Sequence, residues 1–134
     1  MDLSYEHLGL SAQSPVTLKD WYAAVLGARV VFENGQVPPM FLMELPGGVL
    51  LEIYAADTSR PETANNKLAG WRHVALRVAS IESARTELER RGVRFTEEIR
   101  PAGGGGRVLF FQDPEGNLLH LVERTPDSPL ANRG

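Results

Sequence analysis

Apolar and polar side chains alternate along residues 5–11, which is the pattern of a β-strand with one buried face. Apolar side chains at helical spacing follow, at Leu18, Trp21, Tyr22 and Val25. Thr17 and Asp20 resemble an N-cap box at the start of this segment, and Gly27 is the residue type that commonly ends a helix. The pattern therefore predicts a strand followed by a helix.

Three runs rich in β-forming residues come after the predicted helix. They cover residues 30–32, 40–45 and 49–54. The sequences Asn-Gly at residues 34–35 and Pro-Gly-Gly at residues 46–48 separate these runs and suit hairpin turns. The first half of the chain is therefore predicted to fold as β-α-β-β-β.

The second half of the chain shows the same order of elements. Residues 72–78 alternate as a strand, and Ser80 is placed to cap a helix with Glu82 in its first turn and Arg90 in its last. Gly92 then ends this helix. Further strands are expected at residues 94–97, 107–112 and 118–123. The second half is therefore also predicted to fold as β-α-β-β-β.

The two halves match residue by residue as well as element by element. Residues 5–10 and 71–76 both read aromatic, charged, His, aliphatic, small, Leu. Residues 48–53 and 116–121 both read Gly, any residue, Leu, Leu, polar, aliphatic. Because these matches occur in the same order at a near-constant offset, they indicate an internal repeat.

A chain of 134 residues with this repeat is expected to be one α+β domain of two tandem β-α-β-β-β modules. The expected parts are module one at residues 4–55, a polar linker at 56–70, module two at 71–124 and a frayed tail at 125–134. One helix covers only one face of a four-stranded sheet. The two curved, mixed sheets are therefore expected to enclose a shared cleft, within one chain or between two chains.

Composition and charge exclude several kinds of partner. The chain has 14 basic and 17 acidic side chains and a formal net charge of −3, so it lacks the basic surface of a nucleic-acid-binding protein. Residues 1–4 lack the basic start and apolar run of an export signal, and no apolar stretch approaches the roughly 18 residues of a membrane span. We therefore expect a cytoplasmic protein with no nucleic-acid or membrane partner. Because there is no cysteine, any metal must be held by nitrogen and oxygen ligands.

All three histidines of the chain fall at repeat-equivalent strand positions. They are His7, His73 and His120, and Glu52 occupies the fourth equivalent position. If Leu8 packs against the helix, strand alternation places His7 on the opposite face. A single strand histidine is usually structural and a single strand glutamate is usually solvated, but the set of four predicts a metal site. Imidazole and carboxylate ligands suit Ni, Zn, Fe, Mn or Co, so the element stays open.

The duplicated modules, the strand at residues 50–52, the His73 strand and the turn at residues 113–117 resemble the vicinal oxygen chelate superfamily. This superfamily contains glyoxalase I, methylmalonyl-CoA epimerase, ring-cleaving dioxygenases, and the fosfomycin and bleomycin resistance proteins. The resemblance covers residues 4–124 and is nearest to the small bacterial form of glyoxalase I. It implies a homodimer in which each metal site draws ligands from both chains. The implied metal ligands are His7, Glu52, His73 and His120.

Three positions depart from the glyoxalase I pattern. His120 stands where that enzyme has a glutamate that also transfers protons, and Ser11 and Ala56 stand where it has an Arg and an Asn that hold glutathione. Lactoylglutathione is therefore not the expected substrate. We expect a glyoxalase-like metal enzyme, an isomerase or lyase, that chelates two vicinal oxygens of a small substrate and stabilises an enolate. Glu52 is the candidate catalytic base, and His120 is the competing candidate.

Two other functions stay open. One is an iron-dependent dioxygenase, since three histidines and a glutamate can hold iron with positions left for dioxygen. The other is a protein that binds an antibiotic or another small molecule without metal, although this hypothesis leaves the strand histidines unexplained. Residues 103–106, four glycines, lack the Lys-Ser/Thr of a phosphate-binding loop. They are expected instead to form a flexible loop over the cleft, and loops of this kind can close on a substrate.

Overall fold

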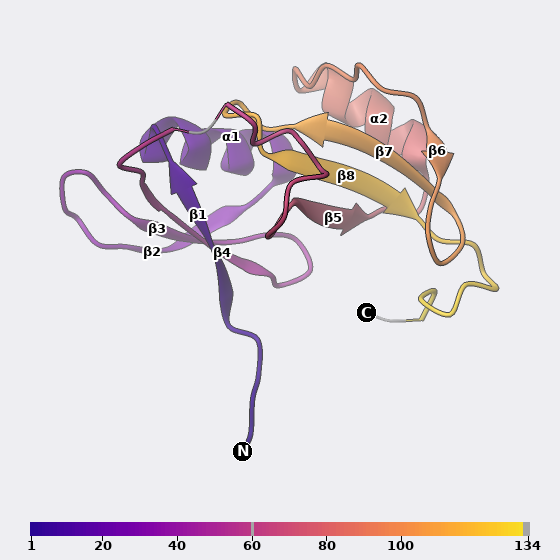
Figure 1. Cartoon of the computed structure of the whole chain (residues 1–134), viewed down its shortest axis with the longest axis horizontal. Helices are drawn as coiled ribbons and strands as arrows, with labels where there is room; N and C mark the ends of the chain where they lie inside the picture. The colour runs from indigo at the N-terminus through magenta and orange to yellow at the C-terminus, as the bar shows by residue number, and fades with distance from the viewer. Residues whose placement is uncertain (60, 133–134) are drawn as a thin grey trace. The chain divides into compact units, whose positions relative to one another are not determined.

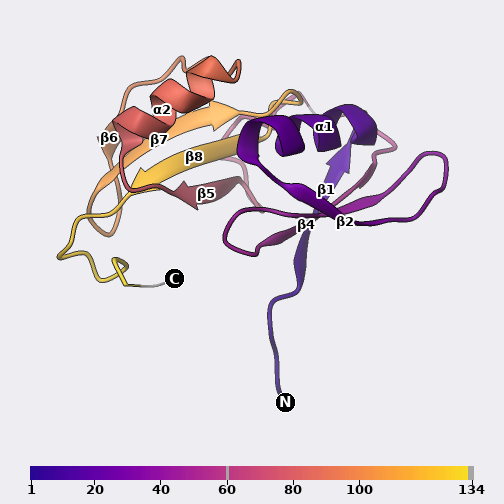
Figure 2. The same ribbon diagram turned by 180° about the vertical axis from the view of Figure 1, so that it is seen from behind.

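Two units, Met1–Pro61 and Glu62–Gly134, make up the chain in the computed structural model, which describes residues 1–59 and 61–132. No helix within these ranges is long and apolar enough to cross a membrane. Each unit contains one helix and one four-stranded sheet (Figure 1). The opposite view shows that each helix covers one face of the sheet in its own unit (Figure 2). The other face of each sheet is therefore not covered by that helix.

The first unit folds in the predicted order β-α-β-β-β. Its elements are β1 (His7–Ala12), α1 (Pro15–Leu26), β2 (Arg29–Glu33), β3 (Phe41–Glu44) and β4 (Leu50–Ala55). The strands lie in the order β1-β4-β3-β2, in which β1 is parallel to β4 and the other neighbours are antiparallel. The sheet is therefore mixed, as the sequence predicts.

The second unit repeats this topology. Its elements are β5 (His73–Arg77), α2 (Ile81–Arg90), β6 (Arg100–Pro101), β7 (Arg107–Gln112) and β8 (Leu118–Glu123). The strands lie in the order β5-β8-β7-β6, and the first two are again parallel. The prediction of two tandem α+β modules is therefore confirmed.

Local sequence sets the ends of the two helices. The N-cap of α1 is Ser14, whose Oγ accepts a hydrogen bond from the Thr17 N–H at 3.4 Å. Pro15 explains why the helix starts before Thr17, because its fixed φ suits the first helical position and it has no N–H to satisfy. The predicted cap at Thr17 is therefore wrong. The left-handed Gly27 that ends α1 and the Ser80 cap of α2 are confirmed.

The strand predicted at residues 94–97 does not form. The strand that occupies this place in the sheet is β6, which is only two residues long and pairs with the start of β7. The Ala102 N–H donates a hydrogen bond to the Gly106 carbonyl at 3.0 Å, which closes the hairpin and places residues 100–101 opposite 107–108. The hairpin closure, and not the apolar pattern before it, determines which residues pair.

The core of each unit lies between its helix and one face of its sheet. Along β4, Leu51 and Ile53 are 1% and 0% exposed, whereas Glu52 between them and Tyr54 after them remain partly exposed. In the second unit, α2, β7 and β8 contribute Ile81, Leu88, Leu109, Leu119 and Leu121 to this core. Phe110, Leu118, His120 and Val122 are also buried, on the opposite face of the sheet. The polar side chains of β4 therefore point away from the helix, as strand alternation requires.

The tail after β8 is bound to the second unit, so the prediction of fraying is wrong for residues 125–132. The Arg77 guanidinium donates hydrogen bonds to the carbonyl oxygens of Leu130 at 2.6 Å and Ala131 at 3.0 Å. Ser128 is buried, with 9% of its surface exposed. Residues 133–134 lie outside the described residues. An arginine in β5, far from the tail in sequence, therefore holds the tail in place.

The loop at residues 103–106 is held by the same tail. The Arg124 guanidinium and the Ser128 hydroxyl donate hydrogen bonds to the carbonyl oxygens of Gly103, Gly104 and Gly105. The loop lies between β6 and β7. These hydrogen bonds tie the loop to the tail, which contradicts the prediction of a flexible loop that is free to close.

Arg107 joins two carboxylates next to the start of α2. Its guanidinium forms a bidentate pair with Glu82, at 2.7 and 3.0 Å, and a further contact with Glu123 at 2.9 Å. The Ile81 N–H also donates to Glu123, at 2.8 Å. The hydrogen bonds from Arg107 lower the pKa of Glu82, and those from Ile81 and then Arg107 lower the pKa of Glu123.

We expect this cluster to make stability depend on pH. A carboxylate with a lowered pKa in the folded state stabilises the fold at neutral pH, and this contribution is lost as acid protonates it. The urea midpoint of the wild-type protein should therefore fall more between about pH 6 and about pH 3 than that of an Arg107→Gln variant. Equal falls in the two proteins would contradict a stabilising role for the cluster.

Candidate metal centre

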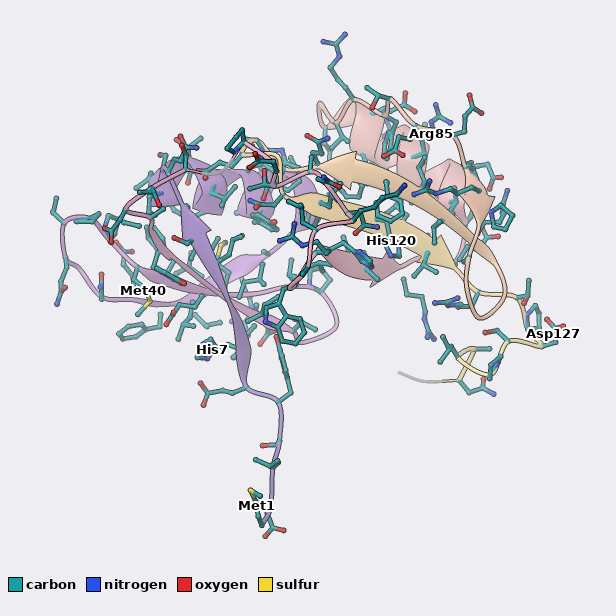
Figure 3. The ribbon with its side chains drawn as sticks, viewed as in Figure 1. Met1, His7, Met40, Arg85, His120 and Asp127 are labelled. Atoms are coloured by element: carbon teal, nitrogen blue, oxygen red, sulfur yellow. The ribbon has the colours of Figure 1, made fainter. Side chains whose placement is uncertain are left out.

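His7 and Glu52 lie next to each other on the face of the first sheet that points away from α1. His7 begins β1 and Glu52 lies in β4, two residues after Leu50, which pairs with His7. The His7 Nε2 and the Glu52 Oε2 are 4.0 Å apart, and the two side chains are 35% and 29% exposed. Figure 3 shows the His7 side chain beside the start of β1. The first unit therefore places one nitrogen and one carboxylate ligand together.

His73 and His120 form the corresponding pair in the second unit. Their strands, β5 and β8, are parallel neighbours, and their ring centroids are 4.9 Å apart. Phe110 of β7 pairs with His120 in the sheet and packs against both imidazoles, at centroid distances of 4.7 Å to His120 and 5.6 Å to His73. The Phe110 ring thus forms an apolar wall that limits where the two imidazoles can point.

Each of the three imidazoles uses its Nδ1 for a hydrogen bond to an oxygen. The partners are Glu6 Oε1 at 2.8 Å for His7, Asn66 Oδ1 at 2.8 Å for His73, and the Leu121 carbonyl at 3.1 Å for His120. An oxygen acceptor of this kind requires the proton on Nδ1, so in the neutral ring Nε2 carries the free lone pair. Within the described parts of the chain, no Nε2 of these histidines forms a hydrogen bond. This is the tautomer in which histidine binds a metal through Nε2.

The surroundings of His120 favour its neutral form. Burial of the ring lowers the pKa of His120, and its electrostatic interactions with His73, Arg124 and Arg100 lower this pKa further, against the effect of the hydrogen bond to Leu121. A metal competes with a proton for the imidazole lone pair. The lowered pKa therefore keeps His120 available as a ligand at neutral pH.

The structure brings the four predicted ligands together as two pairs, one in each unit. Across residues 1–59 and 61–132, no three or more His, Asp or Glu side chains are grouped so that they could hold a metal ion. The first unit contains His7 and Glu52, and the second unit contains His73 and His120. A four-ligand site therefore requires both pairs.

A comparison with protein families gives one result that covers most of the chain. Residues 4–121 match the family described as the Glyoxalase/Bleomycin resistance protein/Dioxygenase superfamily. The chain belongs to this superfamily. It is the vicinal oxygen chelate superfamily that the duplicated modules resemble, so that prediction is confirmed.

Two individual proteins are similar to this chain over nearly their whole length. The Bacillus subtilis (strain 168) protein YwkD is 28% identical over 125 residues, which are 90% of this chain and 97% of YwkD. A glyoxalase family protein from Enterococcus faecalis is also 28% identical, with a TM-score of 0.75 and coverage of 90% of this chain and 97% of that one.

A fosfomycin resistance protein, FosX from Listeria monocytogenes, shares the fold at lower identity. It is 17% identical, with a TM-score of 0.70 and 98% of both chains covered. That structure is of a mutant FosX complexed with Mn(II) and 1S,2S-dihydroxypropylphosphonic acid. The fold of the two modules is therefore shared with this FosX protein.

Proposed function

We propose that this superfamily member is a metal-dependent enzyme in which both ligand pairs hold one divalent cation. The proposed ligands are His7, Glu52, His73 and His120. The observation that carries the proposal is the shared state of the three imidazoles, each with Nδ1 bound to an oxygen and Nε2 left for a metal.

The chemistry of the donor set fits a divalent transition metal. Three imidazole nitrogens and one carboxylate oxygen suit Ni, Zn, Fe, Mn or Co, and the chain has no cysteine to add a thiolate. Mn(II) in the FosX structure supports a divalent ion in a protein of the same fold. The proposal does not select among these elements.

We propose in addition that the chain forms a homodimer in which each metal site takes one pair from each chain. The support is that each unit supplies only two ligands, on one face of its sheet. Two ligands are fewer than the three or four protein ligands that catalytic metal sites usually have. Each pair therefore needs the other to bind metal firmly.

The proposed reaction is proton abstraction from a small substrate with oxygens on two adjacent atoms. When bound, the cation would act as a Lewis acid for the negative charge that develops on these oxygens. Glu52 is the carboxylate of the set and is 29% exposed, so it can take a proton from the neighbouring C–H. His120 is the competing base, but it is only 7% exposed and its Nδ1 is bound to Leu121. We therefore assign proton abstraction to Glu52.

The substrate is proposed not to be lactoylglutathione. Ser11 and Ala56 replace the Arg and Asn that hold glutathione in glyoxalase I, and His120 replaces its proton-transferring glutamate. Neither a hydroxymethyl group nor a methyl group can form the charged and amide contacts of the residues it replaces. Isomerase or lyase chemistry on a smaller substrate is the function that these residues support.

Deuterium exchange tests this function. The metal-loaded protein is incubated in D₂O with small 2-hydroxy ketones, beginning with hydroxyacetone, and deuterium at the carbon that bears the hydroxyl is measured by mass spectrometry. We expect exchange that depends on the metal and falls by more than about a hundredfold in Glu52→Gln, since a positioned base typically contributes at least that factor. The matched control is Glu44→Gln, a carboxylate on the same sheet face that pairs with Arg29.

Two outcomes would contradict the proposed reaction. Deuterium exchange at the same rate without metal would mean that the proposed metal ligands play no part in the reaction. Oxygen uptake with catechols, combined with no exchange on any ketone, would instead favour the iron-dependent dioxygenase.

A further inference from the structure

Tyr54 lies on the same face of the first sheet as His7 and Glu52. It comes two residues after Glu52 in β4 and is 38% exposed. In the pairing with β1, Glu52 lies opposite Gly9 and Tyr54 lies opposite Ser11. The backbone of Tyr54 therefore lies two residues farther along β4 than that of Glu52, the proposed base.

The Tyr54 ring leans back from this position over Gly9. A Cβ added to Gly9 would lie 3.3 Å from Tyr54 Cε1 and 3.6 Å from the phenol oxygen, and the first of these distances is tighter than nine in ten real Cβ contacts. Gly9 does not have a positive φ, so its backbone does not require a glycine. The missing side chain is what allows the phenol to lie there. Because Gly9 pairs with Glu52, the phenol oxygen is placed beside the proposed base.

The Tyr54 hydroxyl lies over Gly9 and has no hydrogen-bond partner in the described part of the chain. Within residues 1–59 and 61–132 it forms no hydrogen bond. The hydroxyl of Tyr5, in contrast, donates to the Leu50 carbonyl at 3.2 Å. Tyr22 is a buried residue of α1 and forms interactions of its own. A phenol that lies over Gly9, with its O–H unused, is a donor available to a bound molecule.

We infer that Tyr54 donates a hydrogen bond to an oxygen of the substrate bound beside Glu52. This inference rests on the proposed function. The hydrogen bond transfers no proton, and it stabilises the charge that the oxygen gains when Glu52 removes a proton from the neighbouring carbon. This hydrogen bond would favour small substrates that chelate the metal through two oxygens and place an acceptor oxygen above Gly9. Gly9 is the residue that positions Tyr54, and Tyr54 is the residue that touches the ligand.

Binding of acetohydroxamate to the Zn(II)-loaded protein tests this assignment without turnover. Acetohydroxamate carries two vicinal oxygens, and its affinity is measured by calorimetry. We expect Tyr54→Phe to weaken binding by about three- to tenfold, the usual effect of one lost hydrogen bond, while the bound Zn(II) stays unchanged. Tyr5→Phe is the matched control, because it removes a hydroxyl that bonds only to the Leu50 carbonyl, and it should leave the affinity as in the wild type.

Gly9→Ala provides a second, independent variant. The added methyl group should displace the phenol and weaken acetohydroxamate binding by a similar factor. Because both substitutions act on the same hydrogen bond, the double variant should bind no more weakly than Tyr54→Phe alone.

The outcomes separate the inference from the proposed function. A wild-type protein that takes up no Zn(II), or takes it up without binding acetohydroxamate, would overturn the proposed function and the inference with it. A Zn(II)-loaded wild type that binds acetohydroxamate no better than Tyr54→Phe would overturn the role of Tyr54 alone. Equal losses in Tyr5→Phe and Tyr54→Phe would do the same, because the effect would then be structural.

Discussion

Replacing His120 with Ala lowers the affinity for a divalent metal by more than about a hundredfold, because even groups that only orient metal ligands contribute ten- to hundredfold. His120 is buried against Phe110, and its Nδ1 is fixed by the Leu121 carbonyl, so Nε2 presents its lone pair without reorganisation. The affinity is measured by titrating metal into chelator-treated protein. Glu52→Gln should give a loss of the same kind from the other unit.

Glu44→Gln is the matched control for these two variants. Glu44 lies on the same face of the first sheet as Glu52, but it pairs with Arg29 at 3.2 Å and is not one of the proposed ligands. Its removal should leave the metal affinity unchanged. Equal losses in Glu44→Gln and Glu52→Gln, or no loss in His120→Ala, would contradict the assigned ligand set.

Replacing Gly106 with Ala destabilises the protein by more than about 3 kcal/mol. The reason is that the backbone conformation of Gly106 costs about 1–3 kcal/mol for other residues, and a steric clash adds to this. The φ of Gly106 is 112°, and an added Cβ would lie 1.9 Å from the carbonyl oxygen of Glu123, which is backbone at the end of β8. The end of β8 would have to move away from β7. The change is measured as the free energy of unfolding in urea.

Gly103→Ala is the control in the same loop. An added Cβ at Gly103 meets nothing within 4 Å, and its φ is not positive. The free energy of unfolding should therefore change by no more than about 0.5 kcal/mol, as at other surface positions. A similar cost for the two substitutions would mean that the loop as a whole resists side chains, and that the contact with Glu123 is not the cause.

Much of the fold could be predicted from the sequence because the chain contains the same module twice. The strands at residues 107–112 and 118–123 have the predicted bounds, and the topology of one unit recurs in the other. Gly27 and Ser80 also act as predicted, because a left-handed residue and an N-cap depend on only a few neighbouring residues. An internal repeat and the local interactions that end a helix can therefore be predicted from the sequence.

The wrong predictions all concern contacts between residues that are distant in sequence, with one exception. The pattern at residues 94–97 is that of a strand, but a hairpin closed farther along places residues 100–101 in the sheet instead. Composition alone makes residues 125–132 look frayed, yet Arg77 holds them through two carbonyl oxygens. The cap at Thr17 is the exception, because Pro15 already favours an earlier start. Long-range hydrogen bonds leave no periodic trace in a sequence.

The candidate site was partly predictable for the same reasons. Strand alternation places His7 with Glu52, and the sheet pairing brings His73 next to His120. The role inferred for Tyr54 has no sequence pattern, because it depends on its ring lying over Gly9 on a neighbouring strand. One signal was present, since Gly9 is a small residue in the middle of a predicted strand, where a glycine often marks a close approach of other atoms.

The most direct test of the central claim is the metal content of the wild-type protein purified without added metal. Elemental analysis, repeated after chelator treatment and incubation with divalent ions, gives the number of ions per chain. We predict about one divalent ion per chain, lost to the chelator and regained on incubation. A protein that contains no metal and regains none with any of Ni, Zn, Fe, Mn or Co would contradict the claim that the two ligand pairs form a metal site.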